Sequence, residues 1–147
     1  MISEKEVLTF LRRGKGIDRI IRAYSDEIKR LEILAKSCGG FSYEEKVQKS
    51  PSLTARFESY IQKAVDKSKE LEVKLIEKEQ VLSEIMKVID SLEDTDQQAV
   101  LIYKYVEGLP FYKVYRKANL SKSSMYRVHD KAIKALAKNW EKVGKNL

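Results

Sequence analysis

Cysteine, histidine, proline and glycine are all scarce in this chain. A single cysteine, Cys38, rules out an internal disulfide and a cysteine-ligated zinc site. A single histidine, His129, neither supports nor excludes a hydrolytic triad, and we expect no enzyme and no metal or other cofactor. The chain has only two prolines and six glycines in 147 residues. This scarcity favours long helices over a sheet of many short strands.

Long apolar runs are missing as well. No segment approaches the roughly 20 apolar residues that a transmembrane helix needs. The N-terminus is polar, and no apolar signal-peptide core follows it. We therefore expect a cytoplasmic protein without a membrane partner. An apolar fraction of 43% is enough to form a core, and the length suits one ordinary domain or two small ones.

Positive charge is concentrated in the last third of the chain. Residues 1–93 hold 18 Lys and Arg against 17 Asp and Glu, whereas residues 94–147 hold 11 against 5. The corresponding net charges are +1 and +6, which account for the +7 of the whole chain. A basic segment beside a neutral one indicates a polyanionic partner, although excess lysine can also serve solubility alone.

Two apolar stripes in the first 93 residues predict a long helical hairpin. They cover residues 7–35 and 57–92, and each advances in alternating steps of three and four residues, which is typical of a coiled coil. Gly14 and Gly16 each weaken the first stripe by about 1 kcal/mol, so its helix is expected to kink there or to start at Ile17.

The connection between the two stripes contains Gly39, Gly40 and Pro51, and we expect it to cover residues 37–52, with a short helical turn around 43–47. The second stripe spans 36 residues, about 54 Å of helix. It is longer than the first, so part of it should remain uncovered by the hairpin. We therefore expect a homo-oligomer, most simply a dimer, or a docking surface for another protein.

Shorter helices are predicted after Leu92. One of the residues 94–96 can cap the first of them, and Gly108 ends it. Pro110 can open the next helix at its first turn. Asn119 tolerates the left-handed backbone of a tight turn, and Ser121 is a good N-cap for the last helix. The pattern predicts two short helices, a tight turn and a longer helix.

The last of these helices has two different sides. Its apolar side carries Met125, Val128, Ala132, Ile133 and Leu136. The polar, mainly basic side carries Lys122, Ser123, Tyr126, Arg127, Asp130, Lys131 and Lys134. Such a helix, after a short helix and a tight turn, suits the major groove of DNA, where its first residues reach base edges. Basic residues of the preceding helix, Lys113 and Arg116, are expected to neutralise phosphates.

The stretch Leu109–Leu136 resembles region 4 of sigma-70 factors. It has a Gly-containing turn, a short helix, a leucine-serine turn and a final helix that ends in Ala-aliphatic-x-x-Leu, and the likeness covers about residues 94–138. By this resemblance Lys122, Ser123, Tyr126 and Arg127 face bases. Ser124, Lys131 and Lys134 then lie nearer the phosphates. The alternative interpretation is a solvated basic helix face that has no partner.

The layout of the whole chain is similar to small phage and prophage proteins of the ArpU/RinA-like type. These late-gene regulators of Gram-positive phages also have a coiled-coil N-terminal part, with Gly-Gly and Ser-Pro in its connecting loop, as at Gly39-Gly40 and Ser50-Pro51 here. The resemblance implies a regulator of phage late or structural genes. Two alternatives remain open: a phage small terminase subunit, and a factor that binds RNA polymerase or a sigma factor but never DNA.

The sequence therefore predicts an all-α protein in two parts. Residues 1–93 form an antiparallel helical hairpin for oligomerisation or docking, and residues 94–147 form a sigma-70 region 4-like helix-turn-helix domain. Double-stranded DNA is the expected partner, and RNA polymerase is a second one. Two further expectations concern single residues: His129 should be a partly exposed structural residue, and Trp140 should pack the chain end onto the motif.

Overall fold

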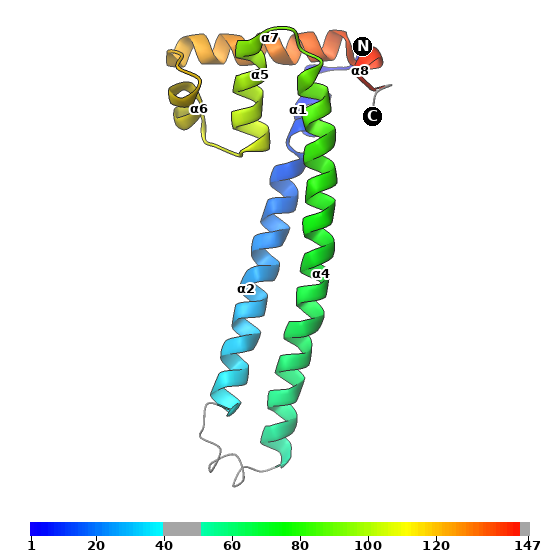
Figure 1. Cartoon of the computed structure of the whole chain (residues 1–147), viewed down its shortest axis with the longest axis vertical. Helices are drawn as coiled ribbons and strands as arrows, with labels where there is room; N and C mark the ends of the chain where they lie inside the picture. Colours follow the sequence, from blue (N-terminus) through cyan, green and yellow to red (C-terminus); the bar gives the residue numbers. More distant parts are fainter. Residues whose placement is uncertain (40–50, 145–147) are drawn as a thin grey trace. The chain divides into compact units, whose positions relative to one another are not determined.

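The computed structural model describes residues 1–39 and 51–144, and every regular element in these two stretches is helical. This confirms the all-α class. The elements are α1 (Glu4–Leu11), α2 (Arg13–Gly39), α4 (Pro51–Asp90), α5 (Thr95–Leu101), η1 (Ile102–Val106), α6 (Phe111–Lys117), α7 (Lys122–Lys138) and α8 (Trp140–Gly144) (Figure 1). None of the described helices is both long enough and apolar enough to span a membrane.

The chain divides into two compact units. Unit 1 contains Met1–Ile17 and Lys78–Leu147, and unit 2 contains Asp18–Glu77. The two ends of the chain thus belong to one unit, because the N-terminal segment packs on the C-terminal helices. The Ile2 N–H donates to the Ala137 carbonyl at 3.2 Å. The separate functions expected for residues 1–93 and 94–147 stay predictions.

The N-terminal helix α1 has a well-formed start. The Ser3 hydroxyl accepts a hydrogen bond from the Glu6 N–H, and the Glu6 carboxylate accepts one from the Ser3 N–H, both at 3.2 Å. This capping box satisfies two backbone donors that a helix leaves unpaired at its start. The last residue of α1 is Leu11, Arg12 is its C-cap, and α2 begins directly afterwards at Arg13. The expected interruption of the first stripe is therefore present, but it lies at Arg12 and not at the glycines.

Gly14 lies where two helices approach closely. A Cβ at this position would be 3.1 Å from Leu82 Cδ2 of α4 and 3.8 Å from the Tyr105 carbonyl oxygen. A Cβ at Gly16, two residues further along α2, would have no neighbouring atom within 4 Å. Only the first of the two glycines is thus explained by packing.

We expect Gly16→Ala to stabilise the protein by about 0.5–1 kcal/mol, because alanine has the higher helix propensity and meets no neighbour. Gly14→Ala gains the same propensity but forces Leu82 to move, so its stability should lie below that of Gly16→Ala. Urea unfolding of the two variants beside the wild type measures both differences. A Gly14→Ala variant at least as stable as Gly16→Ala would contradict the close approach.

Aromatic packing joins α1 to the last helix of unit 1. The rings of Phe10 and Trp140 lie edge to face with centroids 5.1 Å apart. Arg13 lies over the Phe10 ring at 5.3 Å and forms a 2.7 Å ion pair with Glu84 of α4. Trp140 therefore packs on the N-terminal helix, a contact that the sequence does not predict. The stripe residue Phe10 serves this contact and not a coiled coil.

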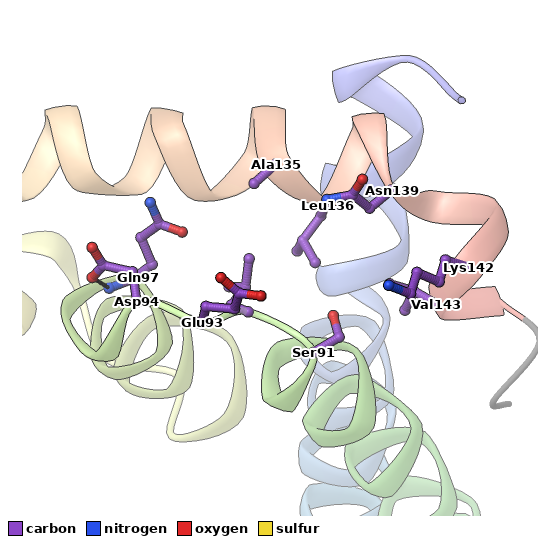
Figure 2. A pocket seen from close by; sticks show the side chains of 10 residues that line it. Ser91, Glu93, Asp94, Gln97, Ala135, Leu136, Asn139, Lys142 and Val143 are labelled. Carbon is purple, nitrogen blue, oxygen red and sulfur yellow. Dashed lines mark hydrogen bonds between the residues drawn. The ribbon is translucent and has the colours of Figure 1, made fainter.

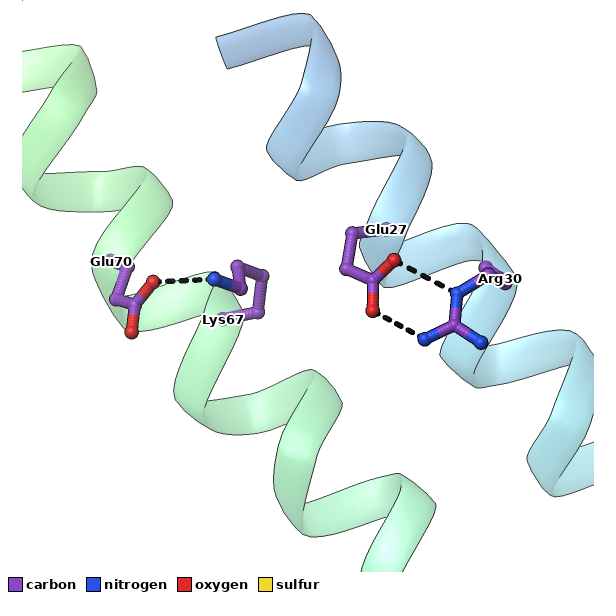
Figure 3. A network of polar contacts seen from close by, with 4 residues as sticks. All are labelled: Glu27, Arg30, Lys67 and Glu70. Atoms are coloured by element: carbon purple, nitrogen blue, oxygen red, sulfur yellow. Dashed lines mark hydrogen bonds and ion pairs between the residues drawn. The ribbon is translucent and has the colours of Figure 1, made fainter. Parts of the chain in front are cut away.

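Unit 2 consists of the adjoining parts of α2 and α4, which lie side by side (Figure 1). Lys67 of α4 lies 4.5 Å over the ring of Tyr24 on α2. On α2, Glu27 pairs with Arg30 at 2.6 Å. On α4, Lys67 itself also pairs with Glu70, at 2.7 Å (Figure 3). The hydrogen bonds from Arg30 lower the pKa of Glu27, and the bond to Glu70 raises the pKa of Lys67.

The helices of unit 2 extend further than expected from the sequence. α2 continues to Gly39 and α4 already begins at Pro51, so both take in residues that we assigned to the connection. Proline suits a helix start because its missing N–H has no partner there anyway. The helical turn expected around residues 43–47 lies outside the described residues.

Apolar side chains remain exposed on both helices of unit 2. They are Ile20, Ile33, Ile61, Val65, Val73, Leu75 and Ile76, and Ile33, Val73 and Ile76 are each more than 60% exposed. The buried positions of the unit include Leu31, Ala35 and Ala64. Exposed apolar side chains are a common feature of surfaces that contact other proteins.

Candidate nucleic-acid interface

The segment from α6 to α7 is built around a tight turn. α6 begins after Pro110, which lies at the N-cap with φ −67° and ψ 154°, one position earlier than the first-turn place expected. The backbone of Asn119 is left-handed, with φ 58°, as predicted. The Leu120 N–H donates to the Tyr115 carbonyl at 3.0 Å, which closes the turn. Gly108, with φ 72°, ends the preceding helical stretch, also as predicted.

The start of α7 is capped by a group of serines. The Ser121 hydroxyl accepts a hydrogen bond from the Ser124 N–H at 3.2 Å, which confirms the predicted N-cap. The same hydroxyl lies 2.9 Å from the Ser124 hydroxyl, and Arg127 donates to Ser124 Oγ at 3.3 Å. These bonds fix the first turn of α7 and hold Arg127 along its surface.

One side of α7 forms the core of this region. Met125 is fully buried together with Val114 of α6 and Val100 of α5, and Leu120 of the turn packs against them. Ala132, Ile133 and Leu136 continue the buried side of α7. The apolar residues that the sequence places on this side are thus buried, with Val128 half-buried. Because three helices share this core, the turn holds α6 and α7 in a fixed arrangement.

The opposite side of α7 is open to solvent and cationic. The predicted site residues on it are exposed, except the half-buried Ser124; the exposed ones are Lys122, Ser123, Tyr126, Arg127, Lys131 and Lys134. On α6, Lys113 and Arg116 are exposed too. None of these basic side chains forms an ion pair with a carboxylate in the described part of the chain, whereas the neighbouring Lys117 pairs with Glu107 at 3.6 Å. Their positive charge is therefore available to an anionic partner.

His129 is the residue that the sequence places wrongly. It is only 8% exposed, and its Nε2 lies 2.7 Å from the hydroxyl of Tyr105 on η1. Burial lowers the pKa of His129 below its ordinary value, more than the neighbouring Asp130 raises it, and burial raises the pKa of Tyr105 to about 12. Both groups are neutral near pH 7, so we infer that the Tyr105 O–H donates to Nε2. The bond ties the middle of α7 to η1.

We expect the stability of the protein to fall as the pH drops through the histidine range. The pKa of folded His129 is below that of the unfolded chain, so its contribution is present above the unfolded pKa and lost as the pH falls through the folded one. His129 is the only histidine of the chain, so urea unfolding at about pH 7.5 and about pH 5.5 isolates it from the carboxylates. The control, His129→Gln, should not show this difference. A wild type that is more stable at the lower pH would contradict the buried neutral state.

A surface depression of about 580 Å³ lies elsewhere in unit 1 (Figure 2). It is lined by the connection between α4 and α5, the C-terminal end of α7, and α8; its side chains include Glu93, Asp94, Asn139 and Lys142. None of the predicted site residues lines it. Asp94 is engaged there, because it accepts the Gln97 N–H at 3.0 Å as the N-cap of α5. The carboxylates of Glu93 and Asp94 make the depression unsuited to a polyanion, so the candidate interface remains the cationic side of α7.

The described residues do not bring three His, Cys, Asp or Glu side chains together as a metal site would require. A comparison with protein families matches residues 44–137 to a family described as a protein of unknown function, DUF1492. The chain belongs to the DUF1492 family. Neither a curated protein nor a solved structure matches it.

The match places the candidate interface inside the shared part of the DUF1492 family. The matched segment begins before α4, includes α4, α5, η1 and α6, and ends one residue before the end of α7. α1 and α2 lie outside it. The family description assigns no activity, so the likeness to sigma-70 region 4 stays a prediction.

Proposed function

We propose that this DUF1492 protein is a sequence-specific DNA-binding transcription regulator. In this proposal α6 and α7 form a helix-turn-helix, and α7 enters the major groove with its cationic side against the DNA. Lys122, Ser123, Tyr126 and Arg127 reach base edges, while Ser124, Lys131, Lys134, Lys113 and Arg116 hold phosphates. The protein acts without a cofactor and is not an enzyme.

One observation carries the proposal. The 17-residue helix α7 is buried along one side and exposed along the other, and the exposed side is basic and free of carboxylate partners in the described residues. Every surface helix has a buried and a solvated side, and what distinguishes α7 is the excess of basic over acidic residues on its solvated side. The net charge of +6 in residues 94–147 supports the same choice.

The likeness to region 4 of sigma-70 factors and to ArpU/RinA-like regulators supports a narrower proposal. The protein would then control late or structural genes of a phage or prophage. The narrower proposal is tested by the position of its binding sites, because a late-gene regulator should protect promoter DNA ahead of phage structural genes in a footprinting experiment.

Fluorescence anisotropy with a labelled DNA duplex tests the general proposal. The wild type should bind the duplex at low salt, and its affinity should fall steeply as salt rises, because phosphate-bound counterions are released on binding. No binding at low salt would remove the proposal. Co-purification with RNA polymerase under the same conditions would then favour a factor that contacts only protein.

For unit 2 we propose a homodimer contact through its exposed apolar side chains. Replacing Val73 and Ile76, which are 63% and 61% exposed, by lysine should leave the fold of the monomer intact and abolish dimerisation. Light scattering of the wild type and the double variant measures the mass directly. A monomeric wild type contradicts the proposed dimer, and a ring of many copies would favour the small terminase subunit instead.

A further inference from the structure

Three cationic side chains from two separate segments meet at one edge of unit 1. Arg12 follows α1, Lys15 lies in the first turn of α2, and Lys104 belongs to η1. The start of α2 lies against η1, because a Cβ at Gly14 would be 3.8 Å from the carbonyl oxygen of Tyr105, the neighbour of Lys104. Burial lowers the pKa of Lys104, and the positive charges of Lys15 and Arg12 lower it further, in keeping with this approach. We call these three residues the Arg12 cluster.

No ion pair neutralises the Arg12 cluster in the described part of the chain. None of its members forms an ion pair with a carboxylate among residues 1–39 and 51–144, in contrast to Arg13, which pairs with Glu84 at 2.7 Å. Asp130 of α7 is engaged with another group, because its carboxylate lies 3.3 Å from His129 Nδ1. Like charges at short range repel one another, so an anion that meets all three gains more than it would at an isolated lysine.

A row of aromatic contacts connects the Arg12 cluster to α7. The ring of Tyr126, a predicted base-facing residue, lies 5.2 Å from the ring of Phe111. Lys104 Nζ lies 4.1 Å from the centroid of the Phe111 ring and donates to the Leu109 carbonyl at 3.4 Å. The Phe111 ring also meets the His129 ring edge to face at 5.7 Å. Through the Phe111 ring, Lys104 therefore lies beside α7, between the exposed Tyr126 and the buried His129.

The position beside α7 matches the position of phosphates around a bound helix. The major groove is about 12 Å wide and a helix with its side chains is about 10–12 Å across, so phosphate rows run close along both flanks of the helix. Cations at the flank meet those phosphates, whereas side chains on the outer side meet base edges.

We propose that the Arg12 cluster binds backbone phosphates of the DNA duplex whose major groove receives α7. The contact adds the N-terminal segment, which lies outside the part that matches the family, to the DNA-binding surface. The inference rests on the proposed DNA-binding function, and it names residues that no base-reading motif includes.

The test is the salt dependence of binding to a random-sequence duplex of about three helical turns, roughly 30 base pairs. Arg12→Gln combined with Lys15→Gln should make the slope of log affinity against log salt less negative by about 2, because each lost phosphate contact removes about 0.9. Adding Lys104→Met, which keeps an aliphatic stem on the Phe111 ring, should remove about one more unit. The control is Lys5→Gln combined with Lys142→Gln, two exposed lysines of the same unit.

The outcomes separate the two proposals. A wild type that fails to bind the duplex at low salt refutes the proposed function, and the inference with it. A wild type that binds, with an unchanged slope in the Arg12→Gln and Lys15→Gln variant, refutes the inference alone. An equal change in the control variant also refutes it, because the effect would then come from net charge and not from a local contact.

Discussion

Replacing both Lys122 and Arg127 by alanine should reduce the affinity for DNA at least about 30-fold and leave the stability of the fold unchanged. A basic side chain that reads a base contributes about 1–3 kcal/mol, and two such losses act together at the start of one helix. Both side chains are exposed, and among the described residues Arg127 makes one polar side-chain contact, its 3.3 Å bond to Ser124. Little folding energy is therefore lost with them. Anisotropy titrations with duplex DNA and thermal unfolding of the same samples give the two values.

The matched control removes the same charge from unit 2. Arg19 and Lys36 are exposed on α2, and their double alanine variant should bind DNA within a factor of a few of the wild type. Unchanged binding by the Lys122 and Arg127 variant, or an equal loss in the control, would show that α7 is not the helix that reads DNA.

Replacing Leu11 by alanine should destabilise the protein by about 2–5 kcal/mol, a large share of the 5–15 kcal/mol typical of a domain. Leu11 is fully buried in unit 1, so its truncation loses buried apolar surface and leaves a cavity. Urea unfolding measures the free energy of unfolding in the wild type and the variant. The effect should be smaller for Leu8→Ala, because Leu8 is only half-buried in the same helix.

The Leu11 result tests whether α1 belongs to the same compact unit as the C-terminal helices. If α1 were a dispensable arm, both leucine variants would unfold at the urea concentration of the wild type. A loss of less than about 1 kcal/mol in Leu11→Ala would therefore contradict the structure of unit 1.

Local features of the candidate site could be predicted from the sequence because they depend on the chemistry of single residues. Asn119 takes the left-handed backbone, Ser121 caps α7 and Asp94 caps α5, each as its side chain favours. The two sides of α7 also follow from spacing alone, because residues three and four apart share a side of a helix. These features place the basic residues in solvent without any knowledge of the tertiary structure.

Contacts between distant segments could not be predicted in this way. The sequence places Phe10 in a stripe with coiled-coil spacing, yet its ring contacts Trp140, because the same spacing serves any partner on that side of the helix. By its spacing His129 falls between the two sides of α7, and its burial depends on polar partners that the pattern does not reveal, the Tyr105 hydroxyl at Nε2 and Asp130 at Nδ1. The π-helical segment η1, which carries Tyr105, has no signal in the apolar pattern.

The most direct test of the account is to follow the backbone amide signals of the full chain by NMR while duplex DNA is added at low salt. The largest changes should fall on Lys122–Lys134 and on α6, with the side-chain signal of Arg127 among them. Changes confined to unit 2, or no change at all, would contradict the claim that α7 lies in the groove of DNA.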